Sequence, residues 1–138
     1  MPKYKRVLLK LSGETFLGER SYGIDPEFTN WLAKELVKAQ KSGSQIACVV
    51  GGGNIFRGVS GISEGFDRVK GDYMGMLATV INGLALQSAI EAAGSPCSVF
   101  SAVRMEPFVE FYSKHLVMES LKNKKVVIFT AGTGNPFF

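Results

Sequence analysis

The sequence predicts an α/β fold, a three-layer α/β/α sandwich around a mainly parallel sheet. Short apolar segments rich in β-branched residues alternate along the chain with longer segments of helical periodicity, which is typical of βαβ units. Residues 46–50 and 126–129 are apolar throughout, as expected for strands that helices cover on both faces. The 138 residues are predicted to form a single domain, 1–138.

The order of the elements follows from the same patterns. Strands are expected at residues 6–11, 46–50, 97–101 and 126–130, and helices at 26–42, 69–93 and 113–122. The intervening irregular segments are a loop or short hairpin at 14–25, a mobile loop at 58–68 and an aromatic patch at 107–112.

The first helix has recognisable signals at both ends. Asp25 is a good N-cap, Pro26 is tolerated at the first helical position, and Gly43 suits the position after the last turn. We predict that this helix buries one apolar face. The residues of that face are Phe28, Trp31, Leu32 and Leu36.

The long helix that ends at Gly94 is predicted to bury a second apolar face, at i, i+3, i+4, i+7 spacing. The residues of that face are Leu77, Val80, Ile81 and Leu84. Gly71, Gly75 and Gly83 each weaken a helix by roughly 1 kcal/mol relative to alanine. Several glycines in one helix suggest close packing or the close approach of a second subunit.

Composition excludes several classes of protein. Apolar residues make up 46% of the chain and charged residues 20%, which argues against disorder. The net charge is +4, but the lysines and arginines are scattered, so we predict no nucleic-acid surface. Cys48 and Cys97 fall in predicted strands and suit a reducing compartment. With no signal peptide or membrane span in the pattern, we predict a cytoplasmic protein that does not bind membranes.

Glycine-bearing loops follow three of the four predicted strands. They contain Ser12-Gly13, Gly51-Gly52-Gly53 and Gly132-Thr133-Gly134. Because parallel strands end at the same edge of a sheet, and ligands bind outside those ends, the three loops should lie together. Backbone N–H groups of glycine loops can surround a phosphate. The sequence therefore predicts a phosphate or nucleotide site at this edge.

Three charged side chains accompany these loops, and each also has an ordinary interpretation. Arg57 could bind a phosphate through two parallel hydrogen bonds, or it is a solvated loop arginine. Lys10, at the end of a strand, offers the positive charge that phosphoryl transfer requires, or simply reaches solvent. Asp72 can accept two hydrogen bonds from a ribose diol, or is a capping acid. Neither the P-loop nor the full dinucleotide fingerprint occurs in the sequence.

Four segments together resemble the bacterial uridylate (UMP) kinases of the amino-acid kinase superfamily. They are residues 10–14 (KLSGE), 51–58 (GGGNIFRG), 71–79 (GDYMGMLAT) and 131–138 (AGTGNPFF). The segments occur in order and at fitting separations over essentially the whole chain, and the second and third are specific to this subfamily. The resemblance implies an amino-acid kinase-like fold and an enzyme of pyrimidine biosynthesis that phosphorylates UMP to UDP with ATP and Mg²⁺.

The resemblance also implies roles for individual residues. Lys10 is the expected catalytic residue. The expected ATP-binding residues are Lys10, Leu11, Ser12, Gly13, Gly53 and Arg57. The expected UMP-binding residues are Gly52, Asp72, Thr133, Gly134, Asn135, Pro136, Phe137 and Phe138. The segment Gly18, Glu19, Arg20, Ser21, Tyr22 and Gly23 resembles a GTP-effector region but is divergent, and no metal ligand is expected in the chain.

The family further implies a homohexamer, with GTP and UTP as candidate effectors. Its members continue for roughly another hundred residues, which supply the adenine pocket and much of the metal site. We therefore expect residues 1–138 to be the N-terminal, UMP-binding half of such a kinase, truncated after the fourth major strand and inactive alone. Two alternatives remain open, namely another phosphotransferase of the same superfamily and a non-catalytic nucleotide-binding fragment.

Overall fold

The computed structural model describes residues 1–57 and 65–138, and its centre is a five-stranded sheet in which every strand pair is parallel. The order across the sheet is β1-β2-β5-β3-β4. The strands are β1 (Arg6–Leu11), β2 (Gln45–Val50), β3 (Cys97–Ser101), β4 (Glu110–Phe111) and β5 (Val126–Thr130). The predicted parallel sheet is confirmed, and so are its four major strands.

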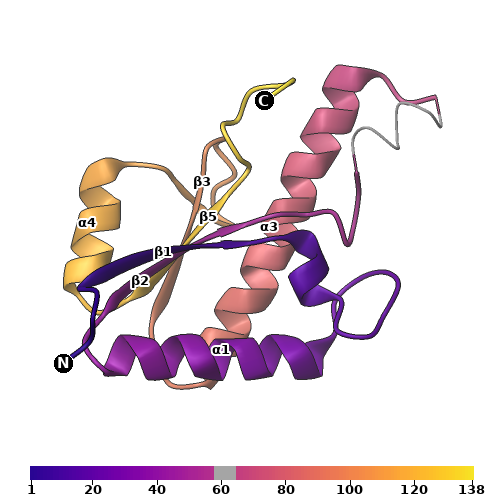
Figure 1. Cartoon of the computed structure of the whole chain (residues 1–138). Coiled ribbons are helices and arrows are strands. Elements are labelled where there is room, and N and C mark those ends of the chain that lie inside the picture. The colour runs from indigo at the N-terminus through magenta and orange to yellow at the C-terminus, as the bar shows by residue number, and fades with distance from the viewer. Residues whose placement is uncertain (58–64) are drawn as a thin grey trace.

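Helices cover both faces of this sheet, as predicted (Figure 1). α1 (Pro26–Lys41) and α3 (Arg68–Ala92) pack on one face, where they share a large apolar core with β1, β2, β3 and β5. α4 (Lys114–Lys122) packs on the other face, where Val117 and Leu121 contact Ala47 and Val127. The helix caps act as predicted, since the side chain of Asp25 accepts from the backbone N–H groups of α1.

Two short elements differ from the sequence-based prediction. Residues 14–25 form the loop of the two predicted alternatives and no hairpin, but the loop opens with an unpredicted turn of 3₁₀ helix, η1 (Gly13–Phe16), which buries Phe16. The aromatic patch contains β4, which pairs with β3 and forms one edge of the sheet. Two residues are too few to show a strand period in the sequence. The predicted mobile loop at 58–68 falls largely outside the described residues, and α3 begins at Arg68.

The helices are correctly placed, but the predicted buried faces are partly wrong. In α1 the buried residues are Thr29, Ala33, Leu36 and Val37, whereas Trp31 is 54% exposed. In α3 Val80 is buried as predicted, but Leu77 is 51% exposed and Ile81 is 48% exposed. Both helices carry apolar residues on more than one side, so the spacing of those residues does not reveal which side meets the sheet.

α3 is also long and apolar enough to cross a membrane, judged by length and composition alone. In this fold its buried face, which includes Leu86 and Ile90, packs into the main core. Core helices commonly meet the same criteria, so this property of α3 does not indicate a membrane span.

The glycines of α3 differ in their surroundings, and this difference predicts opposite effects of alanine. A Cβ at Gly83 would lie 2.6 Å from Cγ2 of Thr130, so G83A should destabilise the fold by about 1–3 kcal/mol. A Cβ at Gly75 would meet nothing within 4 Å, so G75A should stabilise it by roughly 0.5–1 kcal/mol. Urea unfolding of the two variants checks this prediction, and equal shifts in the midpoint would contradict it.

Candidate active site

The loops that follow β1, β2 and β5 meet at the carboxyl edge of the sheet, as the sequence predicts. The first two loops are in direct contact, because a Cβ at Gly13 would lie 2.3 Å from the backbone nitrogen of Gly53. The backbone N–H of Gly51 donates to the carbonyl of Leu11 across the same junction. A side chain at Gly13, or at Gly51, whose Cβ would lie 3.0 Å from the backbone nitrogen of Gly13, would therefore push the two loops apart.

Arg57 extends back over the second loop and pairs with Glu14, which follows the first loop. A Cβ at Gly53 would lie 3.2 Å from the guanidinium carbon, so the absence of a side chain there lets the arginine lie against the backbone. The side chains of Arg57 and Glu14 are both more than half exposed, and ion pairs of this kind contribute only about 0–1 kcal/mol. The guanidinium can therefore exchange Glu14 for a phosphate at little cost.

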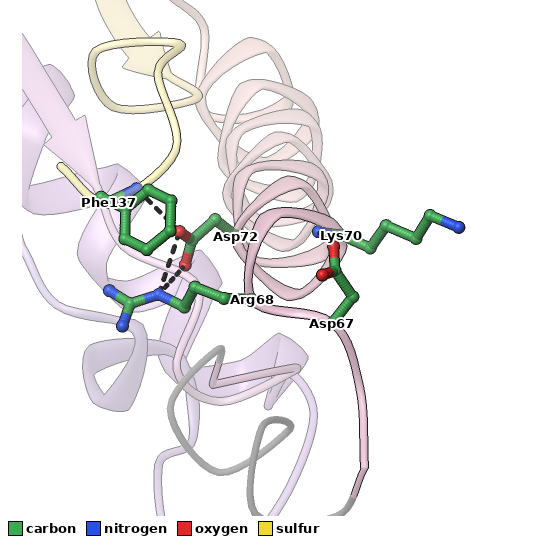
Figure 2. Close-up of polar contacts among 5 residues, drawn as sticks. All are labelled: Asp67, Arg68, Lys70, Asp72 and Phe137. Carbon is green, nitrogen blue, oxygen red and sulfur yellow. Dashed lines mark hydrogen bonds and ion pairs between the residues drawn. The ribbon is translucent and has the colours of Figure 1, made fainter.

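Asp72 lies in the first turns of α3 and holds the end of the described chain (Figure 2). Its carboxylate accepts from the backbone N–H of Phe137 at 2.7 Å and from Nε of Arg68 at 3.1 and 3.2 Å. The Arg68 guanidinium also lies 4.9 Å from the centre of the Phe137 ring. Asp72 thus joins the start of α3 to the loop after β5, although the two are 65 residues apart.

These contacts lower the pKa of Asp72 below its ordinary value, chiefly because the Phe137 N–H donates to the carboxylate and secondly because Arg68 is beside it. The folded-state pKa lies below that of the unfolded chain. The ionised Asp72 carboxylate therefore contributes fully to the stability of the fold above about pH 4, and this contribution is lost as the pH falls through the folded-state pKa. Carboxyl ¹³C NMR should show a lowered titration midpoint for Asp72, and R68Q should raise it. An ordinary midpoint in both the unsubstituted protein and R68Q would contradict this prediction.

Lys10 lies on the opposite face of the sheet from α3. Along β1, Arg6, Leu8 and Lys10 are exposed, whereas Val7, Leu9 and Leu11 pack against the main core. In the strand register Lys10 is opposite Val49, Val49 is opposite Phe129, and Phe129 is opposite Phe100. Lys10 therefore begins a cross-strand row that continues into apolar side chains.

A hollow of about 350 Å³ lies along this row, close to the carboxyl edge. Its apolar lining comes mainly from Val49, Phe100, Tyr112 and Phe129, and the third loop contributes Gly132 and Thr133 to its rim. An apolar, aromatic-lined hollow beside strand-end loops is suited to a flat ring system such as a nucleobase.

The remaining predicted site residues lie near the same edge, but few of them are packed. Within residues 133–138, Gly134 lies against Ala102, and Phe137 is anchored through its backbone, whereas Thr133, Asn135 and Phe138 are exposed. Residues 18–22 are exposed as well. Gly23 ends this segment, and its backbone N–H donates to the carbonyl of Asn54 in the second loop.

The cysteines and the single histidine lie outside this edge. Burial raises the pKa of both Cys48 and Cys97 to about 12, so their thiols stay protonated. His115 lies on exposed α4, where it is near Glu119. Among residues 1–57 and 65–138, no three His, Cys, Asp or Glu side chains gather in a way that would hold a metal ion.

Sequence reasoning missed several residues that shape the site. The partners of Arg57 and Asp72, namely Glu14 and Arg68, were not singled out. Nor were three polar residues that join α3 to the loops: Asn54, Thr79 and Asn82. A sequence signal for Asn82 was available, because this polar residue lies within an apolar part of α3. The structure shows that Asn82 is fully buried.

Comparison with known families gives one match over nearly the whole chain. A family model described as the amino acid kinase family matches residues 5–136. The uridylate kinase of Bacteroides thetaiotaomicron is 59% identical over 138 residues, and that of Porphyromonas gingivalis is also 59% identical. In both cases the match covers 100% of this chain and 58% of the relative.

Solved structures give the same result for the fold. The crystal structure of UMP kinase from Ureaplasma parvum superposes with a TM-score of 0.90 at 36% sequence identity. The superposition covers 99% of this chain and 60% of that structure. The chain therefore spans somewhat more than half the length of the proteins that it matches.

Proposed function

Because this chain belongs to the amino acid kinase family, we propose that residues 1–138 are the acceptor-binding half of a uridylate kinase. The whole enzyme would transfer the γ-phosphoryl group of ATP to UMP and release UDP and ADP. One observation carries the proposal: three glycine-bearing strand ends meet at one edge, with Lys10 on one side of it, Asp72 on the helix that covers the other side, and Arg57 against the second loop. The uridylate kinases that it matches support the choice of acceptor.

On the donor side, Lys10 and the loop that follows it contact the ATP phosphates. Leu11, Ser12 and Gly13 offer backbone groups, while the ammonium of Lys10 stabilises negative charge as the bond to the β–γ bridging oxygen breaks. The exposed position of Lys10 at a strand end leaves its ammonium free to meet a phosphate. Gly53 and Arg57 face the phosphates from the second loop, with Arg57 leaving Glu14 as they bind.

On the acceptor side, Gly52 and the segment from Thr133 to Phe138 surround UMP, and a phosphate oxygen of UMP forms the new bond to phosphorus. Asp72 is assigned to the UMP ribose. A carboxylate has about four acceptor positions, and Arg68 and Phe137 already use three of them. A ribose diol would therefore use the remaining position and displace one present donor, so binding UMP should reposition Arg68 or Phe137.

Mg²⁺ is expected to arrive with ATP, because Mg²⁺ is commonly held by substrate phosphates. Self-association is a further part of the proposal: Tyr73, Leu77 and Ile81 form an exposed apolar stripe along α3 that suits a subunit interface in a homohexamer. Cytoplasmic location, control by GTP through residues 18–23, and UTP as a second candidate effector complete it.

Calorimetric titration of the 138-residue chain with UMP tests the acceptor half. We expect UMP to bind selectively over CMP and AMP, and we expect D72A and R57A to weaken that binding. A folded chain that bound none of the three nucleotides would contradict the assignment of the acceptor site to residues 1–138.

A second candidate is nucleotide binding without turnover by residues 1–138 themselves, which align with 58% of the length of the Bacteroides relative. We expect the chain alone to form no ADP in the presence of ATP and UMP. A fusion to the remaining 42% (100 − 58) of the Bacteroides relative should restore turnover. UMP-dependent ADP formation by the unfused chain would refute this expectation, and an inactive fusion that still binds UMP would favour a binding module.

A further inference from the structure

Two asparagine side chains form a buried pair beneath the glycine loops. Nδ2 of Asn54 donates to Oδ1 of Asn82 at 3.0 Å, and Nδ2 of Asn82 donates back to Oδ1 of Asn54 at 2.7 Å. Asn54 is 3% exposed and Asn82 is fully buried. Buried amides that lose a partner destabilise a protein, so a reciprocal pair fixes the relative position of the two segments that carry it.

Each asparagine also holds a backbone group with its remaining donor. Asn82 donates to the carbonyl of Gly51 at 2.7 Å, and Asn54 donates to the carbonyl of Gly23 at 2.8 Å. Both NH₂ groups therefore use both of their hydrogens. Through these bonds α3 is tied to the loop after β2, and that loop is tied to the segment that ends at Gly23.

Thr79, three residues before Asn82, holds the loop after β5. Its hydroxyl accepts from the backbone N–H of Ala131 at 2.7 Å and donates to the carbonyl of Met76 at 2.6 Å. Ala131 is fully buried and has φ of +67°, a left-handed conformation that is unfavourable for a residue with a Cβ. The bond from Thr79 helps to hold this strained residue at the point where β5 becomes the loop.

Thr79 and Asn82 are neighbours on one helical face, since residues three apart on a helix lie side by side. Between them they contact the loops after two adjacent strands, β2 and β5. The second loop also lies directly on this helix, because a Cβ at Gly52 would be 2.7 Å from Cβ of Ala78. α3 therefore sets the spacing between two loops to which the proposed function assigns phosphate and UMP contacts.

We propose that Asn82, with its partner Asn54, and Thr79 are positioning residues for phosphoryl transfer, which hold the loops after β2 and β5 at the separation that the reaction requires. The inference rests on the proposed function and deepens it. None of the three side chains is assigned a contact with substrate. They act through the backbone of Gly51, Gly52 and Ala131, and a displacement of about 1 Å between reacting groups can reduce a rate about 100-fold.

The test uses N82D and T79V in the fusion with the Bacteroides relative. N82D keeps the shape of the side chain but removes both donors, and T79V removes the hydroxyl. T79S keeps the hydroxyl and should rescue turnover. T29V is the matched control, because Thr29 is a buried threonine of α1 whose hydroxyl donates only within its own helix, to Asp25.

We expect kcat for UMP to fall about 100-fold in N82D and T79V, with T79S and T29V close to the parent. Lowering the pH should partly restore N82D, because the introduced carboxyl regains one donor when it is protonated. In the 138-residue chain, T79V should accelerate amide exchange at Ala131, whereas T29V should leave it unchanged.

The inference would be overturned if N82D and T79V lost only as much thermal stability as T29V does and kept the kcat of the unsubstituted fusion. If the fusion without substitutions were inactive, the proposed function would be refuted. If T79V then also left amide exchange at Ala131 unchanged, the positioning role would be refuted as well.

Discussion

Replacing Gly13 with alanine is expected to abolish most of the phosphoryl transfer that we propose, measured in the fusion with the Bacteroides relative. The new Cβ would lie 2.3 Å from the backbone nitrogen of Gly53 and 2.8 Å from that of Asn54. Backbone atoms cannot turn aside as a flexible side chain can, so the first and second loops must separate. Because both loops are assigned to the phosphates, we expect G13A to reduce kcat about 100-fold, with a loss of stability of about 1–3 kcal/mol.

A graded series separates the effect on the site from general destabilisation. A Cβ at Gly51 would lie 3.0 Å from the backbone nitrogen of Gly13, so G51A should have a smaller effect than G13A. G83A should destabilise the fold to a similar degree, but it acts between α3 and Thr130 of β5 and not at the junction of the first two loops. Steady-state kinetics on the fusion, beside urea unfolding of each variant, give both quantities. Equal kcat values for G13A and G83A would contradict the role of the loop junction.

The arrangement of the loops could be predicted from the sequence because it depends only on local patterns. Alternating strands and helices require a parallel sheet, and in a parallel sheet the residues after each strand share one edge. Gly13, Gly52 and Gly132 are therefore placed correctly without any knowledge of tertiary contacts. What the pattern did not reveal is that the first two loops touch, since contact depends on the β1–β2 register.

Two of the contacts of the site residues could not be predicted because their partners lie far away in the chain, although Arg68 is only four residues from Asp72. Glu14 is 43 residues from Arg57, and Phe137 is 65 residues from Asp72. No local spacing distinguishes Glu14 from other exposed acids. The exposed positions of Leu77 and Ile81 were missed for a related reason: α3 carries apolar residues on several sides, and only the packing decides which side is buried.

The position of Lys10 bears on how the donor and acceptor of the proposed reaction would share this edge. Lys10 projects from the α4 face of the sheet, beside the apolar row of Val49 and Phe129, whereas Asp72 belongs to α3 on the other face. Thr133, which is assigned to UMP, lines the hollow on the same face as Lys10, so the acceptor would contact both faces at the carboxyl edge.

Substitution of Lys10 therefore provides a selective test of the donor side. K10M should reduce kcat by two to three orders of magnitude, on the scale of about 100- to 1,000-fold for losing one preorganised group that stabilises developing charge. UMP affinity and the urea midpoint should stay unchanged, because Lys10 is exposed and lies across the sheet from Asp72. K34M, at an exposed lysine of α1, is the matched control and should change none of the three. If K10M lowered UMP affinity and left kcat unchanged, Lys10 would belong to the acceptor side. If K10M changed neither UMP affinity nor kcat, Lys10 would be an ordinary strand-end lysine in contact with solvent.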